Sequence, residues 1–151
     1  MSALKDRLRD DLTSSIKARD SIRSGTLRMV LTAVTNAEVS GKQARELTDD
    51  DVLGVLTSEA KKRREAAEAF DAGHRPELAD KERAEAAVLA EYLPEPIGVD
   101  EVRAIVAAAI EQTGADGMKA MGQVMGVVQP QVKGRADGAV VAAEVRRQLG
   151  A

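Results

Sequence analysis

The sequence predicts an all-α protein with an N-terminal four-helix part followed by a smaller three-helix C-terminal part. Apolar residues recur at intervals of three and four over most of the 151 residues, which is the period of amphipathic helices. No segment alternates polar and apolar residues for long enough to form a strand. Aromatic residues are limited to Phe70 and Tyr92, so we expect a core of aliphatic side chains packed between helices.

The first two helices are expected within residues 1–41. One apolar residue in every four marks the first helix, with the stripe Leu4, Leu8, Leu12 and Ile16. A second helix should follow Asp20 and end at Gly41. Its apolar face is predicted to consist of Ile22, Thr26, Met29, Val30, Ala33 and Ala37.

Capping signals define the third and fourth helices. Thr48 is a favourable N-cap residue, and Asp51 stands at the third helical position, where an acidic side chain completes a capping box. This helix should continue to Ala72, with Gly73 as the residue that follows its C-cap. Pro76 then opens the fourth helix at its first turn. Apolar residues of these helices are Val52, Leu53, Leu56, Ala60, Ala67 and Phe70, then Ala79, Ala86, Leu89 and Leu93.

A break between Leu93 and Gly98 separates the two parts, because Pro94 and Pro96 cannot continue a helix. We therefore expect an N-terminal domain over residues 1–94 and a C-terminal domain over residues 95–151. Three apolar clusters mark the C-terminal helices: Val102, Ile105, Val106, Ala109 and Ile110; Met118, Met121, Val124 and Met125; Val140, Val141, Val145 and Leu149. The second cluster is predicted to be at least partly buried.

The usual catalytic residues are nearly absent. The sequence has no Cys, which excludes disulfides and thiolate chemistry, and its one histidine, His74, lies in a loop without a nucleophile motif. No group of carboxylates has metal-ligand spacing. We therefore predict no catalytic residues, no metal and no cofactor, and a chain that is not a self-contained enzyme.

The N-terminal sequence predicts a cytoplasmic protein. It has no apolar stretch typical of a signal peptide, and Asp6, Asp10 and Asp11 argue against a transit peptide. No apolar run approaches the roughly 18 residues that a membrane span needs, so no membrane interaction is expected.

The stretch from Lys133 to Gly138 is the most distinctive candidate site. Gly134 can adopt the positive φ of a tight turn, and Asp137 can cap the last helix. Lys133 and Arg135 are then expected to be exposed just before a helix N-terminus, a favourable place for a phosphate. The stretch is either a purely structural turn or a turn that contacts an anion.

Two other features have both a structural and a functional interpretation. In the basic run from Lys61 to Arg64, Lys61 and Arg64 share a helix face, which is either a solvated face paired with Glu65 and Glu68 or a contact surface. Gly122 and Gly126 share another face, which serves either helix packing or a ligand.

These motifs together resemble the GatB/YqeY family, specifically its free-standing YqeY-like members. The resemblance runs essentially from end to end. It includes Thr26-Leu27-Arg28-Met29, Asn36-Ala37-Glu38, Leu47-Thr48-Asp49, Lys61 to Glu65, Phe70, Tyr92-Leu93-Pro94, Met121-Gly122, Val124-Met125, Pro130 and Val132 to Gly138.

The resemblance implies an all-α fold and a relation to the tail of GatB, a subunit of the tRNA-dependent amidotransferase. That tail helps to hold tRNA, whereas the catalytic chemistry lies in other domains. Family members often have lysine where this chain has Gln123 and Gln131, and each loss removes a phosphate contact. Gly98 replaces the family's usual serine cap of the first C-terminal helix.

The leading hypothesis is a non-catalytic binding module that contacts tRNA phosphates through its C-terminal part. Residues 102–151 hold six basic and four acidic residues. The candidate contacts are Lys119, Lys133, Arg135, Arg146 and Arg147, with Lys61 and Arg64 in the N-terminal part. Expected partners are tRNA and an amidotransferase or an aminoacyl-tRNA-related protein, but not DNA.

Two alternatives remain open. One is a protein–protein adaptor without RNA binding, favoured by the acidic centre and the methionines from Met118 to Met125. Residues 65–101 hold three basic and eleven acidic residues, a net charge of −8. The other alternative is a carbon–nitrogen ligase with glutamine as amido donor, the activity of the larger enzyme.

Overall fold

A computed structural model describes residues 2–150, and within them the fold is all-α, as predicted. This part of the chain contains seven α-helices, one 3₁₀ turn and no strand. In chain order the elements are α1 (Ala3–Lys17), α2 (Ser21–Val39), α3 (Asp49–Ala72), α4 (Pro76–Ala90), α5 (Val99–Thr113), η1 (Met118–Ala120), α6 (Met121–Val132) and α7 (Gly138–Gly150).

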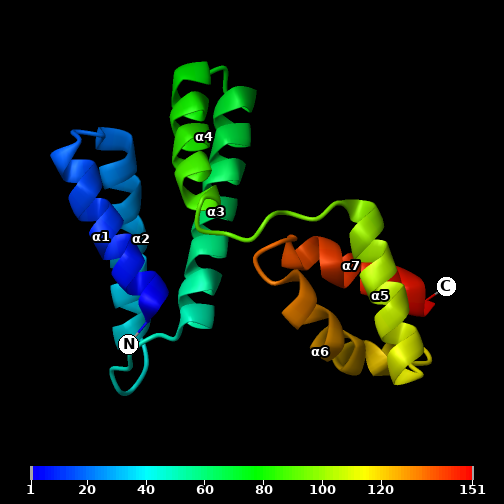
Figure 1. Cartoon of the computed structure of the whole chain (residues 1–151). Helices are drawn as coiled ribbons and strands as arrows, with labels where there is room; N and C mark the ends of the chain where they lie inside the picture. The colour runs from blue at the N-terminus through cyan, green and yellow to red at the C-terminus, as the bar shows by residue number, and fades with distance from the viewer. Residues whose placement is uncertain (1, 151) are drawn as a thin grey trace. The chain divides into compact units, whose positions relative to one another are not determined.

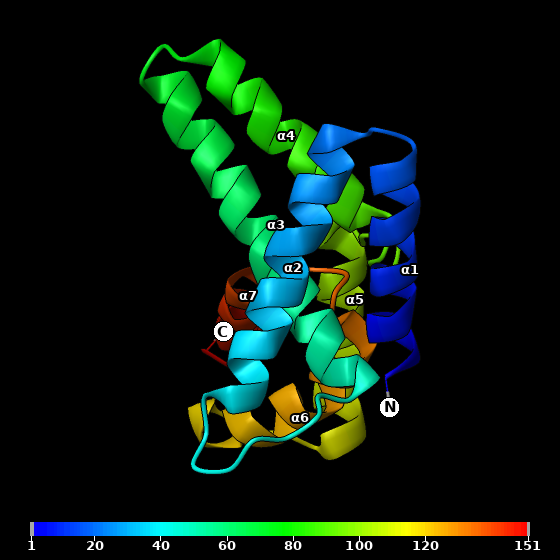
Figure 2. The same ribbon diagram turned by 90° about the vertical axis from the view of Figure 1, so that its left-hand side faces the viewer.

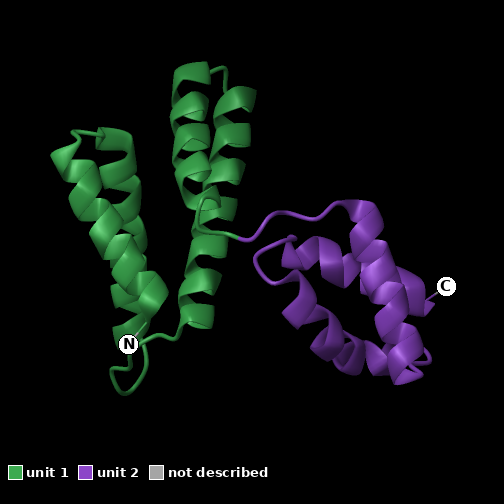
Figure 3. Ribbon diagram, in the orientation of Figure 1, with its two compact units in different colours: residues 1–93 green, residues 94–151 purple. Residues whose placement is uncertain are grey.

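The chain divides into two compact units, residues 1–93 and residues 94–151 (Figure 3). Each unit has its own hydrophobic core. The predicted break in helix is present, because α4 ends at Ala90 and α5 begins at Val99. Four helices therefore precede the break and three follow it, as the sequence predicts.

The first unit consists of two helical hairpins. Helices α1 and α2 lie antiparallel side by side, as do α3 and α4 (Figures 1 and 2). All four contribute to one aliphatic core, whose fully buried members include Leu8, Leu27, Leu56 and Leu89. Burying a side chain of this size contributes about 1.5–3 kcal/mol each.

The N-cap predicted at Thr48 is present, and Asp20 also caps a helix of the first unit. Asp20 caps α2 by accepting a hydrogen bond from the Arg23 backbone N–H (3.1 Å). The capping box of α3 is complete, because the Thr48 hydroxyl accepts from the Asp51 N–H (3.2 Å) and the Asp51 carboxylate accepts from the Thr48 N–H (3.1 Å). Pro76 stands in the first turn of α4.

The end of α3 corrects one prediction. Gly73 is the C-cap itself, with φ −85°, and His74 is the following residue, with φ 60°. The Arg75 N–H donates to the Phe70 carbonyl (2.8 Å), which closes the turn around His74. Histidine is among the few residues other than glycine that adopt this left-handed conformation at moderate cost.

The apolar face predicted for α2 is partly wrong. Ile22 and Met29 are 40% and 39% exposed, whereas Leu27 and Val34 are fully buried. Helix α2 packs against α1, α3 and α4, so its core-facing arc is rotated from the predicted stripe toward Leu27 and Val34. On α1, Ile16 is likewise exposed, at the end of the predicted stripe.

The second unit packs α5, α6 and α7 around a core made largely of valines. Its fully buried members include Val106, Val124, Val128, Val141 and Val145. Gly98 caps α5 through its backbone conformation alone, without a side-chain hydrogen bond.

Three of the four residues in the predicted Met118–Met125 cluster contribute to this core: Val124 is buried, and Met121 and Met125 pack against it. The prediction is wrong for Met118, which is 49% exposed because it lies in the 3₁₀ turn before α6.

Candidate nucleic-acid interface

The solvent-facing side of α6 carries two glycines and ends at an exposed lysine. Gly122, Gly126, Gln129 and Lys133 follow one another at intervals of four, three and four residues, so they share one face of the helix. All four are exposed. The opposite face of the helix is buried in the core through Val124, Val128 and Val132. We call this face the α6 surface. Lys119 lies three residues before it, in the exposed η1 turn.

The two glycines of the α6 surface do not serve helix packing. A methyl group added at Gly122 or Gly126 would have no atom of the protein within 4 Å, apart from its own helix backbone. The backbone of α6 is therefore bare at these positions and accessible to a bulky group. Of the two interpretations of this glycine pair, the structure does not support packing inside the protein.

Lysine side chains stand at both ends of the α6 surface. Fourteen residues separate Lys119 from Lys133, which corresponds to about 21 Å along a helix. Within residues 2–150, no carboxylate lies within ion-pair distance of either lysine. The remaining polar side chain of the α6 surface, Gln129, is neutral.

The turn after α6 has the predicted backbone geometry. Gly134 has φ 75°, and Asp137 accepts a hydrogen bond from the Ala139 N–H (2.9 Å) at the start of α7. The Arg135 carbonyl accepts from the Ile97 N–H (3.0 Å), which fastens the turn to the segment before α5. Lys133 is exposed, as predicted, but it lies at the C-cap of α6 and not at the start of the final helix, which begins at Gly138.

Arg135 is not exposed as predicted, because it holds this turn in place. Its side chain is half-buried, and its guanidinium donates to the Glu95 and Gln131 carbonyls (3.2 and 3.3 Å). It also lies 3.8 Å from the Glu101 carboxylate. These contacts occupy donors that a phosphate would need, so Arg135 has a structural role here.

The two arginines of α7 differ in their surroundings. Arg147 forms two hydrogen bonds with Glu144 (2.7 and 3.0 Å), and these, with one from Gln148, lower the pKa of Glu144 to about 2. Arg146 is exposed, with no carboxylate within ion-pair distance among residues 2–150. Lys119, Lys133 and Arg146 are therefore the candidate cations that remain uncompensated in the second unit.

The basic run of α3 belongs to the first unit and is not one surface. Arg64 is exposed and Lys61 is half-buried with a bonding partner of its own. Arg63, which the sequence places in a solvated run, is instead nearly buried among Glu59, Glu82 and Glu85. Its carboxylate partners come from the facing helix α4 as well as from α3, and only the tertiary structure brings them together.

A second polar cluster, at the end of α4, was also not predicted. The Tyr92 hydroxyl donates a short hydrogen bond to Asp11, and the Arg7 guanidinium lies 4.6 Å from the centre of the Tyr92 ring. Arg23 pairs with Glu91 at 2.6 Å. These contacts join the last turn of the first unit to α1 and α2. The spacing of these residues along the chain gave no signal of the cluster.

The described residues offer no sign of a metal site or a membrane span. Within residues 2–150, no three His, Cys, Asp or Glu side chains are placed to hold a metal ion. Across the same residues, no helix combines the length and the apolar character that a membrane crossing requires.

Comparison with known proteins identifies the chain's relatives. The model of the family described as Yqey-like protein matches residues 5–149. The chain is 30% identical over 149 residues to Altered inheritance of mitochondria protein 41, mitochondrial, of Pyrenophora tritici-repentis, covering 96% of this chain and 80% of that protein. It is 38% identical over 88 residues to an uncharacterized protein of Schizosaccharomyces pombe, covering 58% of this chain and 70% of that protein.

Proposed function

The chain belongs to the Yqey-like protein family, and from this membership we propose that it is a non-catalytic binding module with a tRNA-related or amidotransferase-related role. The binding element is the α6 surface together with Lys119. The partner is the phosphate backbone of tRNA. The module would bind the same tRNA as an amidotransferase or another protein that acts on aminoacyl-tRNA.

The observation that carries the proposal is the combination of bare backbone on one face of α6 with two uncompensated lysines, Lys133 at the C-cap of the helix and Lys119 in the turn before it. Without side chains at Gly122 and Gly126, a phosphodiester backbone can approach the helix closely. Lys119 and Lys133 are then available to neutralise phosphates at either end. Arg146 on α7 is a third cation of the same unit.

Such contacts would position RNA without reading its sequence. Contacts to phosphates fix orientation and carry no base information. Both aromatic residues of the chain lie before residue 94, so the second unit has no aromatic platform on which unpaired bases could stack. The proposal therefore concerns a structured RNA that is recognised by shape and charge.

A titration of unfractionated tRNA with the purified full-length chain at low ionic strength tests this function. We expect binding that weakens steeply as salt is added. The Lys119→Ala, Lys133→Ala double variant should bind several-fold more weakly than the wild type. The Arg147→Ala variant serves as a control, because Glu144 already compensates that charge. Absence of any complex at low salt would contradict the proposal.

A protein–protein adaptor is the second candidate, favoured by exposed apolar side chains in the same unit. Val99, Met118 and Val140 are 57%, 49% and 48% exposed. A pull-down from cell extract with and without ribonuclease separates the two candidates. A partner that survives ribonuclease, together with no tRNA binding by the pure chain, would favour the adaptor.

The proposal assigns the protein to the cytoplasm and assigns it no cofactor. Carbon–nitrogen ligase activity with glutamine as amido donor is a property of the larger enzyme in this interpretation. Glutamine-dependent amide formation by the pure chain would overturn that part of the proposal.

A further inference from the structure

The chain passes from the first unit to the second once, between Ala90 at the end of α4 and Val99 at the start of α5 (Figures 1 and 3). Each unit has its own core, so the motion of one unit against the other depends on how freely this segment bends. A segment without contacts of its own would be a flexible tether. Most of this segment is instead fixed, one end to each unit.

The beginning of the segment is fixed to the first unit. The N–H groups of Glu91, Tyr92 and Leu93 donate to carbonyls of the last turn of α4 (3.3, 3.0 and 3.2 Å), so hydrogen bonding continues beyond the end of the helix. Tyr92 is buried, and its hydroxyl donates to the Asp11 carboxylate of α1. The Leu93 side chain packs against the core of the same unit. The first unit therefore holds the chain as far as Leu93.

The end of the segment is fixed to the second unit. The Arg135 guanidinium donates to the Glu95 carbonyl (3.2 Å), and the Arg135 carbonyl accepts from the Ile97 N–H (3.0 Å). The Ile97 side chain packs against the core of the second unit. Arg135 is itself held in the turn after α6, because its N–H donates to the Val132 carbonyl (2.8 Å). The second unit therefore holds the chain from the Glu95 carbonyl onward.

Only Pro94 and the N-terminal side of Glu95 lie between these two anchors. Both residues are exposed, and Pro94 has no N–H to donate. The ring of Pro94 fixes its own φ at about −65°. Pro94 and Pro96 also restrict the backbone of the residue before each of them, which is Leu93 and Glu95 respectively. Rotation is thus confined to the few backbone bonds between the ψ of Leu93 and the φ of Glu95.

From these contacts we propose that residues 93–95 form a hinge of limited range about which the two units change their orientation. Its anchors are Tyr92 in the first unit and Arg135 in the second. Hinges typically confine a conformational change to a few residues at the ends of structural elements. Each anchor lies within one unit, so the hinge is present in every orientation of the units. The inference does not depend on RNA binding.

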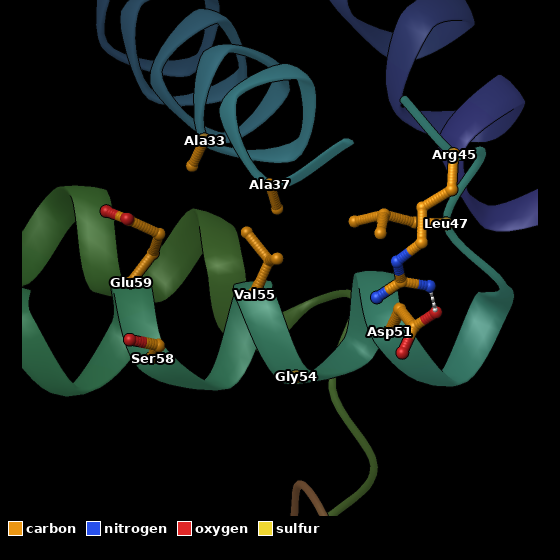
Figure 4. Close-up of a pocket in the computed structure, with 9 residues that line it drawn as sticks. All are labelled: Ala33, Ala37, Arg45, Leu47, Asp51, Gly54, Val55, Ser58 and Glu59. Carbon is orange, nitrogen blue, oxygen red and sulfur yellow. Dashed lines mark hydrogen bonds and ion pairs between the residues drawn. The ribbon is translucent and has the colours of Figure 1, made fainter. Parts of the chain in front are cut away.

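Magnetic alignment transmitted across the hinge measures its range in the full-length chain. The sequence has no cysteine, so Ser58→Cys introduces a single thiol for a lanthanide tag in the first unit. Ser58 is exposed on α3, at the edge of a pocket between α2 and α3 (Figure 4). Residual dipolar couplings of the second unit then report how much of the alignment reaches it. We expect couplings several-fold smaller than in the first unit but clearly different from zero.

Order parameters of the backbone amides locate the hinge. We expect the rigid value, about 0.85, at Leu93 and at Ile97, because each is bonded within its own unit. Glu95, whose N–H lies between the anchors, should have a lower value than both. A flexible tether would instead have low values throughout the segment.

Two variants change the hinge in different ways. Pro94→Gly frees the joint without touching an anchor, so it should reduce the transmitted couplings at least twofold while the order parameters of both anchored ends are unchanged. Arg135→Ala removes one anchor and should extend the low order parameters from Glu95 to Ile97. Arg103→Ala, which removes an exposed arginine of the same unit, is the matched control and should change neither quantity. Thermal melts verify folding, and Pro94→Gly decides alone if the Arg135 variant is unfolded.

Four results would overturn the proposal. Couplings near zero throughout the second unit would mean that the segment is a free tether. Couplings equal in the two units would mean that the chain is one rigid body. Low order parameters at Leu93 or Ile97 in the wild-type chain would mean that the anchors do not hold. Unchanged couplings in Pro94→Gly would place the joint elsewhere.

Discussion

Arg63 of α3 and Glu85 of α4 lie 3.1 Å apart (Nε to Oε2), and both side chains are nearly buried, at 13% and 10% exposed. Glu59 and Glu82 also approach the same guanidinium, at 3.3 and 3.8 Å. One cation thus serves three carboxylates at the centre of the α3–α4 hairpin. Burial, reinforced by the neighbouring Glu82, raises the pKa of Glu85 above its ordinary value.

Removal of Arg63 should strongly destabilise the first unit. Arg63→Met would remove the ion-pair partner of Glu82 and Glu85 and leave Glu59 paired only with Lys62, and we expect a loss of about 3 kcal/mol or more in the free energy of unfolding. Lys62→Met is the matched control, because Lys62 is 63% exposed and should change stability by less than about 0.5 kcal/mol. Urea unfolding of both variants measures the difference, and equal stabilities would contradict this role for Arg63.

The pH dependence of Glu85→Gln should report the raised pKa. A carboxyl group whose pKa is raised by folding holds its proton more tightly in the folded state, so its contribution is complete at acid pH and is lost as pH rises through the folded pKa. Glutamine mimics the protonated form. The melting temperature of the variant, relative to wild type, should therefore rise between pH 4 and pH 7.

Glu77→Gln provides a control of opposite sign. Arg75 donates to the Glu77 carboxylate and lowers its pKa, so its contribution is present at neutral pH and is lost as pH falls. The variant should lose melting temperature relative to wild type as pH rises from 4 to 7. The same slope in both variants would rule out the assignment at Glu85.

The turn after α6 should depend on Arg135 and not on Lys133. Arg135→Ala removes hydrogen bonds to two carbonyls, and we expect a loss of about 1–3 kcal/mol. Lys133→Ala removes an exposed side chain and should stay within about 0.5 kcal/mol. Chemical unfolding of the two variants tests this contrast. An unchanged free energy of unfolding in Arg135→Ala would show that the turn does not need the hydrogen bonds of the Arg135 side chain.

Replacement of two glycines of the second unit should change stability in opposite directions. Gly134→Val forces a β-branched residue to φ 75° and should destabilise by about 1–3 kcal/mol. Gly126→Ala adds a methyl group in open space within a helix and should stabilise by up to about 1 kcal/mol. Thermal melts give both values, and a destabilised Gly126→Ala would mean that the glycine is needed for packing.

The sequence was informative wherever local chemistry decides structure. Periodicity predicted the helices, Pro94 and Pro96 predicted the break, and Thr48 with Asp51 predicted the capping box. Each of these signals involves residues within a few positions of one another. The positive φ of Gly134 was predictable for the same reason.

Tertiary contacts decided what the sequence could not. Periodicity alone cannot say which of two apolar faces of α2 enters the core, so Met29 was misplaced while Leu27 was missed. Arg135 and Arg63 looked like solvated cations because their partners lie on other segments of the chain. The candidate RNA contacts remain predictions. Among the candidate cations of the second unit, those without a carboxylate within ion-pair distance are Lys119, Lys133 and Arg146.

The salt dependence of tRNA binding tests the central claim most directly. The logarithm of the association constant should fall linearly with the logarithm of salt concentration, with a slope set by the number of phosphates neutralised. We predict that the Lys119→Ala, Lys133→Ala variant flattens this slope by about 1.4–1.8, the value for two lost phosphate contacts. Gly122→Ala with Gly126→Ala should weaken binding without lowering the melting temperature. Unchanged affinity and slope in the lysine variant would contradict the assignment of the α6 surface as the RNA contact.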